Sequence, residues 1–189
     1  MSNNKLHNPK AGDLLISEPF LQDENFVRSV VLLCEHNEEG SFGLIINKPS
    51  ILKLGELVEV LDFLDKEVFV GGPVEQNTLH FIFTGESGLE GSISLGENIW
   101  WGGDYDSLVD NLKLGLIDQE SVRFFLGYSG WGSKQLEDEL ADETWIICRD
   151  KLDEQTLNFT PEELWKKLLK NMGGEFKVIE NYPLDPRLN

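Results

Sequence analysis

The segment RFFLGYSGWGSKQLEDEL, residues 123–140, carries the most informative pattern in the chain. Its apolar start predicts a strand, its glycines predict a turn, and its acidic end predicts a helix. This order is found where backbone N–H groups face a phosphate, or where a nucleophile sits on a sharp turn. The segment approaches three motifs of known chemistry and completes none of them.

The hexapeptide GYSGWG, residues 127–132, is close to the nucleophile elbow G-x-S-x-G. Trp131 stands where the elbow has its second glycine, and the hydrolase order also needs a histidine after the serine. All histidines precede Ser129: His7, His36 and His80. A different chain order occurs in other folds, but the pattern favours Ser129 as a turn residue rather than a nucleophile.

Two nucleotide motifs are also incomplete. Gly127 and Gly132 have the spacing of a P-loop, but Ser133-Lys134 reverses its final pair and moves the ammonium away from the β- and γ-phosphates. A dinucleotide fingerprint would need glycine at position 135. Helix N–H donors can still hold a small anion, so a weak candidate site remains beside the favoured reading of a structural turn. Its residues are Gly130, Trp131, Gly132, Ser133, Lys134 and Gln135.

The formal net charge is −18 and the pI is near 4.4. A protein with so large a negative charge repels nucleic-acid phosphates and anionic membranes. The densest basic group, Lys166, Lys167 and Lys170, fits the polar face of one helix near its C-terminal end. We therefore expect no direct nucleic-acid binding and no membrane partner.

The cysteines and the N-terminus point to a cytoplasmic protein. Cys34 and Cys148 both lie in apolar, strand-like runs, which is typical of buried free thiols in a reducing compartment. The first ten residues lack the apolar region of a signal peptide. No apolar run approaches the roughly 18 residues that a membrane helix requires.

A metal site is not predicted. Cys34, Glu35 and His36 are adjacent residues of metal-ligating types, and strand alternation would put Cys34 and His36 on one face. His80 is a possible third ligand beside these two, but no pair has zinc-finger spacing. A buried thiol and a hydrogen-bonded histidine are the favoured reading. Carboxylates are too abundant for a catalytic acidic pair to be identified. We therefore predict no metal, no cofactor and no catalytic residue.

Helices and strands are interleaved along the chain, which predicts an α+β fold with a mixed sheet. A hairpin is expected where the polar run 37–40 separates two strands. The predicted strands are 12–16, 30–35, 41–47, 67–70, 79–83, 92–95, 122–127 and 144–148. The predicted helices are 52–64, 105–115, 133–141 with Ser133 as N-cap, and 160–173 with Thr160 as N-cap. Adjacent Trp100 and Trp101 lie in a strand and are expected on opposite faces.

Four blocks in this order resemble the YqgE/AlgH family, and together they cover most of the chain. The first is GDLLIS at 12–17, and the second runs from VVLLCEHN at 30–37 to GLIINKP at 43–49. The third is VGGPV at 70–74, followed by Leu79-His80. The fourth is GYSGWG at 127–132, followed by Gln135 and Trp145. Further family-motif positions are Glu35, His36, Asn47, Gly71, Gly72, Pro73, His80 and Trp145.

The resemblance implies a cytosolic bacterial protein with a single α+β domain. Its mixed, bifurcated β-sheet is expected to curl into a pseudo-barrel with flanking helices. The expected organisation is a loose segment at 1–10, the domain at 11–176 and a tail at 177–189. The resemblance implies no catalytic residues, although the family is often labelled as transcriptional regulators.

Three functional hypotheses follow. The first is a non-enzymatic binding or regulatory protein with an unknown protein or small-molecule partner. The alternative is a small-molecule enzyme, or a phosphate or nucleotide binder, that uses the glycine-rich turn at 127–134. The third is direct transcriptional regulation, which the charge does not support.

Overall fold

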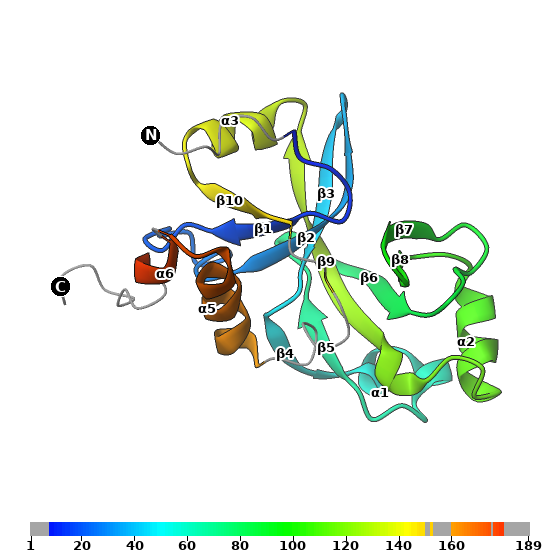
Figure 1. The fold of residues 1–189 in the computed structure, drawn as a ribbon. Helices are drawn as coiled ribbons and strands as arrows, with labels where there is room; N and C mark the ends of the chain where they lie inside the picture. The colour runs from blue at the N-terminus through cyan, green and yellow to red at the C-terminus, as the bar shows by residue number, and fades with distance from the viewer. Residues whose placement is uncertain (1–7, 150–151, 153–159, 175, 180–189) are drawn as a thin grey trace.

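The computed structural model describes residues 8–149, 152, 160–174 and 176–179, and its strands form one curled sheet in a single α+β domain (Figure 1). The strand order is β10-β1-β2-β3-β9-β6-β8-β7, with β4 and β5 branching from β9. The strands are β1 Leu14–Ser17, β2 Val30–Asn37, β3 Gly40–Ile45, β4 Pro49–Lys53, β5 Glu67–Val70, β6 Val74–Thr84, β7 Ile93–Gly96, β8 Ile99–Trp101, β9 Val122–Gly132 and β10 Trp145–Cys148.

Strand β9 is the centre of this sheet because it pairs with three other strands. Strand β6 runs antiparallel along one edge of β9. Along the other edge, β5 pairs in parallel with residues 124–126 and β3 pairs antiparallel with residues 129–132. The sheet therefore divides along a single strand, which confirms the predicted mixed, bifurcated and curled sheet.

The division occurs where the chain leaving β5 crosses β9. Gly71 donates its N–H to the Leu126 carbonyl and accepts the Ile45 N–H, both at 2.8 Å. A Cβ on Gly71 would lie 2.2 Å from the Gly127 carbonyl oxygen, and one on Gly72 would lie 2.2 Å from the backbone of Tyr128. Two backbones can approach this closely only where side chains are absent. The glycines of the third and fourth sequence blocks therefore form one crossing.

The glycine-rich segment 127–132 is strand, so its predicted turn is wrong. Strand β9 continues to Gly132 because β3 pairs with residues 129–132. Gly127 has φ +65°, a left-handed conformation that glycine adopts readily. The strand changes partner from β5 to β3 immediately after this residue. The glycines thus permit the crossing and the change of partner, and they do not end the strand.

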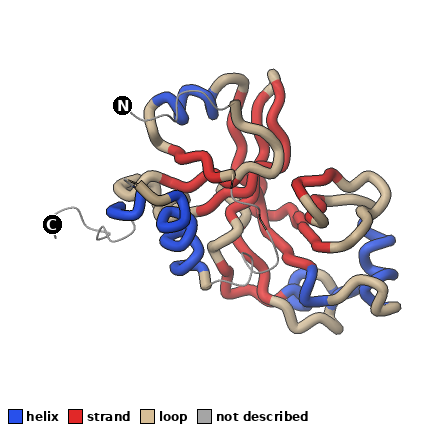
Figure 2. The backbone as a smooth tube through the Cα atoms, viewed as in Figure 1, coloured by secondary structure: helices blue, strands red, loops and turns tan. Residues whose placement is uncertain are grey.

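Helices flank the sheet on several sides (Figure 2). Helix α5, Pro161–Met172, packs Leu164, Trp165, Leu168 and Leu169 into one core cluster with β1 and β2. Helices α1, Leu54–Leu57, and α2, Tyr105–Lys113, cover a second cluster with β5, β6 and the start of β9. Helix α3, Gln135–Ala141, covers a third cluster that contains Trp131 and Trp145.

Two helix predictions are confirmed. Helix α2 ends at Lys113 and is closed by Gly115 as expected: this glycine has φ +68° and donates its N–H to the Leu112 carbonyl, while the Leu116 N–H donates to the Asn111 carbonyl. Helix α5 begins with the expected capping box, in which the Glu163 carboxylate accepts the Thr160 N–H. Trp100 and Trp101 pack against different core clusters, as strand alternation predicts.

Two helix predictions are wrong. Residues 52–64 form the end of β4, the single turn of α1 and a 3₁₀ turn at Glu59–Leu61, because Val58 is extended and interrupts the helix. The residue before α3 is Lys134 with φ +62°, so Ser133 is not its N-cap. The short helix α6, Phe176–Ile179, lies where the domain meets the expected tail at 177–189. Residues 1–7 and 180–189, where loose ends are expected, lie outside the described residues.

Within the described ranges, no helix combines the length and the apolar character needed to cross a membrane.

Candidate functional site

Two hollows open beside Gly130 and Trp131. We call the first the hairpin hollow; it encloses about 450 Å³ and is lined by Glu35, Asn37, Glu39, Phe42, Tyr128 and Gly130, among others. We call the second the clamp pocket; it encloses about 300 Å³ and is lined by Asp23, Phe26, Trp131, Glu139, Thr144 and Trp145, among others. Both hollows therefore border the family-signature segment of β9.

The hairpin register arranges side chains in cross-strand rows, and two adjacent rows face opposite sides of the sheet. Glu35, Phe42 and Gly130 are cross-strand neighbours, as are His36, Ser41 and Trp131. Side chains of adjacent rows point to opposite faces. The first row faces the hairpin hollow with Tyr128, whereas the second row faces α3.

Aromatic rings form the floor of the hairpin hollow. Phe42 stacks on Tyr128 with centroids 4.5 Å apart and on Trp101 with centroids 4.7 Å apart. His80 meets Phe42 edge-on at 5.2 Å. The rim carries exposed Glu35, whose carboxylate accepts the Asn37 amide N–H at 2.8 Å. An aromatic floor below carboxylates attracts a cation through both the quadrupoles of the rings and the negative charge of the carboxylates.

His80 is held in one tautomer beside this floor. The Thr78 hydroxyl donates to the Glu75 carbonyl at 2.8 Å, so the His80 Nε2–H must donate to Thr78 Oγ1, 3.0 Å away. Burial lowers the pKa of His80, and the nearby Glu75 carboxylate opposes that effect. The imidazole is therefore neutral near pH 7 and braces the Phe42–Tyr128 stack.

The burial of His80 predicts a pH-dependent stability. As pH falls below the ordinary histidine pKa of about 6.5, the unfolded chain binds the proton first, so the folded state loses stability until its own lower pKa is passed. His80→Gln, which retains a donor toward Thr78, removes this dependence. Urea unfolding between pH 8 and pH 5 should show the stability of wild type decreasing relative to the variant. A difference that stays constant with pH would contradict this assignment.

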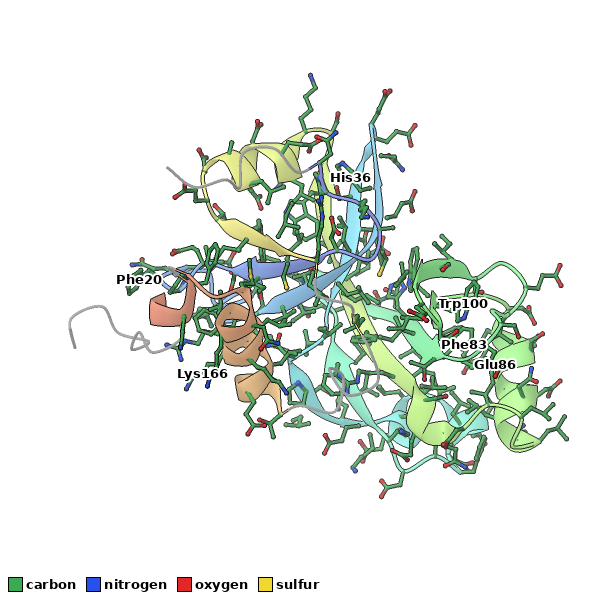
Figure 3. The ribbon with its side chains drawn as sticks, in the orientation of Figure 1. Phe20, His36, Phe83, Glu86, Trp100 and Lys166 are labelled. Atoms are coloured by element: carbon green, nitrogen blue, oxygen red, sulfur yellow. The ribbon has the colours of Figure 1, made fainter. Side chains whose placement is uncertain are left out.

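A serine–histidine pair lies on the opposite face, and sequence reasoning missed its serine. His36 Nδ1 is 2.8 Å from Ser41 Oγ, and His36 Nε2 is 3.9 Å from Glu137 on α3. Figure 3 shows His36 where the hairpin passes beside α3. In a catalytic triad the serine bonds to Nε2 and the acid to Nδ1, which is the reverse of this arrangement. The hairpin turn predicted at 37–40 could have identified the pair, since it places Ser41 opposite His36.

Glu139 links two buried tryptophans to α3. Its Oε2 atom accepts the indole N–H of Trp131 at 2.8 Å and that of Trp145 at 2.7 Å. Its Oε1 atom accepts the Gln135 side-chain amide at 2.8 Å. We call Glu139 and these three donors the tryptophan clamp. It attaches α3 to β9 and β10, so Trp131 and Trp145 have a structural role that the sequence did not reveal.

The predicted anion-site residues make other contacts. The Ser133 hydroxyl donates to the Glu38 carbonyl at 2.8 Å, and the Gln135 side chain accepts the Gly132 N–H at 3.0 Å. Helix α3 has only seven residues and carries Glu137 and Asp138 in its first turn. These carboxylates disfavour an anion at this helix start. The anion site stays a prediction, and the local geometry does not favour it.

Other family-motif residues hold the fold. Buried Asn47 accepts the Val30 N–H at 2.8 Å and donates to the Arg28 carbonyl at 2.9 Å, which fixes the chain that enters β2. Ser129 is fully buried and donates its hydroxyl to the Gly71 carbonyl at 3.1 Å. It is therefore neither a turn residue nor an accessible nucleophile. Pro73 is exposed directly after the crossing.

Side chains of metal-ligating types are scattered in the described part of the chain. There, no three His, Cys, Asp or Glu side chains gather closely enough to hold an ion. Cys34 and Cys148 are buried free thiols, and burial raises the pKa of Cys34 well above its ordinary value. Cys34 is therefore not a ready thiolate ligand.

Known proteins resemble the chain along nearly its whole length. A UPF0301 protein of Cytophaga hutchinsonii is 44% identical over 179 residues, which cover 94% of this chain and 98% of that protein. A UPF0301 protein of Chlorobium limicola is 37% identical over 186 residues, covering 98% of this chain and 99% of that protein.

Two solved structures share the fold. The AlgH protein of Pseudomonas aeruginosa superposes with a TM-score of 0.68 at 28% identity, covering 97% of this chain and 98% of that one. A Corynebacterium diphtheriae protein superposes with a TM-score of 0.76 at 18% identity, covering 93% and 94% of the two chains, and shows the fold alone. The AlgH-like family model matches residues 14–177. The strand crossing, the hairpin and the tryptophan clamp thus stand in a chain that belongs to the AlgH-like family, as the sequence blocks indicated.

Proposed function

We propose that this chain is a non-enzymatic binding protein whose hairpin hollow receives a lysine or arginine side chain of a protein partner. The observation that carries the proposal is the carboxylate rim above the stacked floor of Phe42 and Tyr128. Of the described residues that line this hollow, none is basic. A guanidinium can pack against this aromatic floor while its N–H groups reach the rim carboxylates.

The overall charge supports a basic partner. A formal charge of −18 accelerates encounter with cationic surfaces and opposes contact with nucleic acid. We therefore propose that any regulatory role is exerted through a protein and not through direct DNA contact. Two buried free thiols fit a reducing cytoplasm, where we place the protein.

The contacts of the candidate nucleophiles support binding over catalysis. Ser129 is fully buried, and its hydroxyl donates to a backbone carbonyl. Ser41 borders the hairpin hollow, but its hydroxyl bonds to the imidazole nitrogen opposite to the one used in a triad. A hollow lined by aromatic side chains and carboxylates is equipped to hold a cation.

The test uses N-acetyl-arginine amide, with the citrulline analogue as an uncharged probe of the same shape. Amide NMR titration of the full chain should show shifts gathered at residues 35–42 and 128–130 for the arginine probe, with much smaller shifts for citrulline. The double variant Glu35→Gln/Glu39→Gln keeps the Glu35 acceptor oxygen and should weaken binding about three- to tenfold. Equal shifts with both probes, or shifts gathered elsewhere, would overturn the proposal.

A further inference from the structure

Three apolar side chains of one short segment are exposed at the surface. Leu57, Val60 and Phe63 expose 40%, 43% and 41% of their surface. The same segment sends three buried leucines into the second core cluster: Leu54, Leu61 and Leu64. A single exposed apolar residue is ordinary, whereas several gathered in one place are typical of a contact surface.

The segment folds back on itself. A Cβ on Gly55 would lie 3.0 Å from the Cα atom of Asp62, so α1 packs closely against the chain that follows the 3₁₀ turn. Leu57 at the end of α1 and Phe63 after the turn are therefore held on one compact element. The buried leucines fix this element to the core, so its exposed side chains are presented from a firm base.

Carboxylates accompany the exposed apolar residues. Each of the three is directly preceded by an exposed acid: Glu56, Glu59 and Asp62. The neighbouring lysines are engaged elsewhere. Lys53 pairs with Asp65 at 3.1 Å, and Lys66 pairs with a carboxylate after α2 at 3.1 Å. Among the described residues, no ion pair neutralises Glu59 or Asp62. We call the three acids, with Leu57, Val60 and Phe63, the acidic–apolar surface.

The backbone of this segment limits how a partner can bind. Its N–H groups are used internally: Val58 donates to the Leu54 carbonyl, Leu61 to the Val58 carbonyl and Leu64 to the Leu61 carbonyl. A backbone bonded in this way does not accept an added strand, which needs free N–H and C=O groups. A partner must therefore make its contacts through side chains, as an amphipathic helix does.

The charge of the acidic–apolar surface selects among possible occupants. A second copy of the chain would bring the same carboxylates into a symmetric contact, and an anionic membrane would repel them. The chain's own segments 153–159 and 180–189 carry more acidic than basic side chains. A helix that carries lysines or arginines beside an apolar face complements both the apolar residues and the carboxylates.

We propose that the acidic–apolar surface docks a basic amphipathic helix of a protein partner. Leu57, Val60 and Phe63 contact the apolar face of that helix, and the carboxylates attract its basic flanks. This docking does not rest on the proposed function of the hairpin hollow, because it uses none of the side chains that line the hollow. Helix α1 also lies at the opposite end of the molecule from the tip of the β2–β3 hairpin (Figure 1).

The test uses a labelled peptide of sequence LKKLLKKLLKKL, which has the apolar spacing of an amphipathic helix, and its acidic counterpart LEELLEELLEEL. Fluorescence anisotropy with the full chain should show the lysine peptide binding at least about tenfold more tightly than the glutamate peptide. Val60→Ser/Phe63→Ser should raise the Kd of the lysine peptide about tenfold, because apolar contact is lost. Glu59→Gln/Asp62→Asn should raise it about threefold and weaken its dependence on salt.

Two matched variants control for the loss of apolar surface and of charge elsewhere on the chain. Leu114→Ser/Leu116→Ser removes two other exposed apolar side chains. Asp138→Asn/Asp142→Asn removes two exposed charges at α3. Both variants should bind the lysine peptide as wild type does. Thermal unfolding confirms that each variant is folded before its Kd is compared, and Glu59→Gln/Asp62→Asn leaves every apolar contact in place.

The position of the bound peptide and the identity of the occupant complete the test. Amide NMR shifts caused by the lysine peptide should gather at residues 54–66. Shifts gathered at the hairpin hollow, equal affinity for the two peptides, or equal losses in the matched variants would overturn the proposal. A dimer of the chain that Val60→Ser/Phe63→Ser dissociates would assign the surface to a second copy and overturn it too. Binding to neutral phosphatidylcholine vesicles that the same variant abolishes would likewise assign it to a membrane.

Discussion

Replacing Gly71 by alanine is expected to destabilise the folded protein by about 4 kcal/mol, a loss typical of severe packing errors. The added Cβ would lie 2.2 Å from the Gly127 carbonyl oxygen, 3.0 Å from Leu44 Cδ2 and 3.2 Å from Phe125 Cβ. The nearest of these atoms belongs to the backbone of the central strand, which cannot move aside without breaking its pairing with β5 or β6. Urea unfolding followed by tryptophan fluorescence measures the loss.

Gly85→Ala is the matched control for this substitution. Its Cβ would meet nothing nearer than 3.6 Å, and its backbone needs no left-handed conformation. We expect a change within about 0.5 kcal/mol, as for ordinary surface substitutions. If Gly71→Ala were as stable as Gly85→Ala, the two chains would not cross as closely as described.

Glu139→Ala is expected to destabilise the protein by about 3 kcal/mol, because it leaves the indole N–H groups of two buried tryptophans without an acceptor. These N–H groups now reach the Glu139 carboxylate at 2.8 Å from Trp131 and 2.7 Å from Trp145. The tryptophan fluorescence of the folded state should also change, since both indoles lose a charged neighbour. Denaturant unfolding and the emission maximum provide the two readouts.

Two further variants distinguish the loss of the indole acceptor from the loss of a charge on helix α3. Glu139→Gln retains one acceptor oxygen and should lose less stability than Glu139→Ala. Asp138→Ala removes an exposed charge from the first turn of the same helix and should change stability by less than about 1 kcal/mol. Similar losses in Glu139→Ala and Asp138→Ala would show that helix charge matters here and that the tryptophan clamp does not.

The local parts of this fold could be predicted from sequence. The turn at 37–40 predicted the hairpin, Thr160 and Glu163 predicted the start of α5, and Gly115 predicted the end of α2. Each of these features depends on neighbours within a few residues. The branching of β9 depends on pairing with residues more than fifty positions away, such as β5, and no local pattern encodes it.

The largest error, the turn predicted within residues 127–132, also arose because pairing with residues distant in the sequence decides the structure there. Glycines in the segment 127–132 have the local character of a turn, and only the crossing chain at Gly71 and Gly72 shows that they serve a close approach within a strand. The helix predicted at 52–64 failed because its apolar spacing is shared by an irregular segment that buries Leu54, Leu61 and Leu64. In both segments, 127–132 and 52–64, tertiary contacts overrode the local sequence preference.

Some of the residues singled out in the sequence lie at the two hollows: Glu35 and Gly130 line the hairpin hollow, Gln135 and Trp145 line the clamp pocket, and Trp131 borders both. Other family-motif residues, such as Asn47 and Gly71, are buried and hold the fold. Phe42, Phe26 and Glu139 were missed, because an aromatic residue in a strand and an acid on a helix are typical of ordinary packing and surface. Their significance comes from the partners that the fold brings to them.

Native-state hydrogen exchange of residues 127–132 tests most directly whether the glycine-rich segment is a strand crossing or a ligand-binding turn. The account predicts that the amides in 129–132 that face β3 exchange only through the large opening that also exposes buried Phe124 and Phe125. Exchange of all these amides within seconds, as in an open loop, would contradict it.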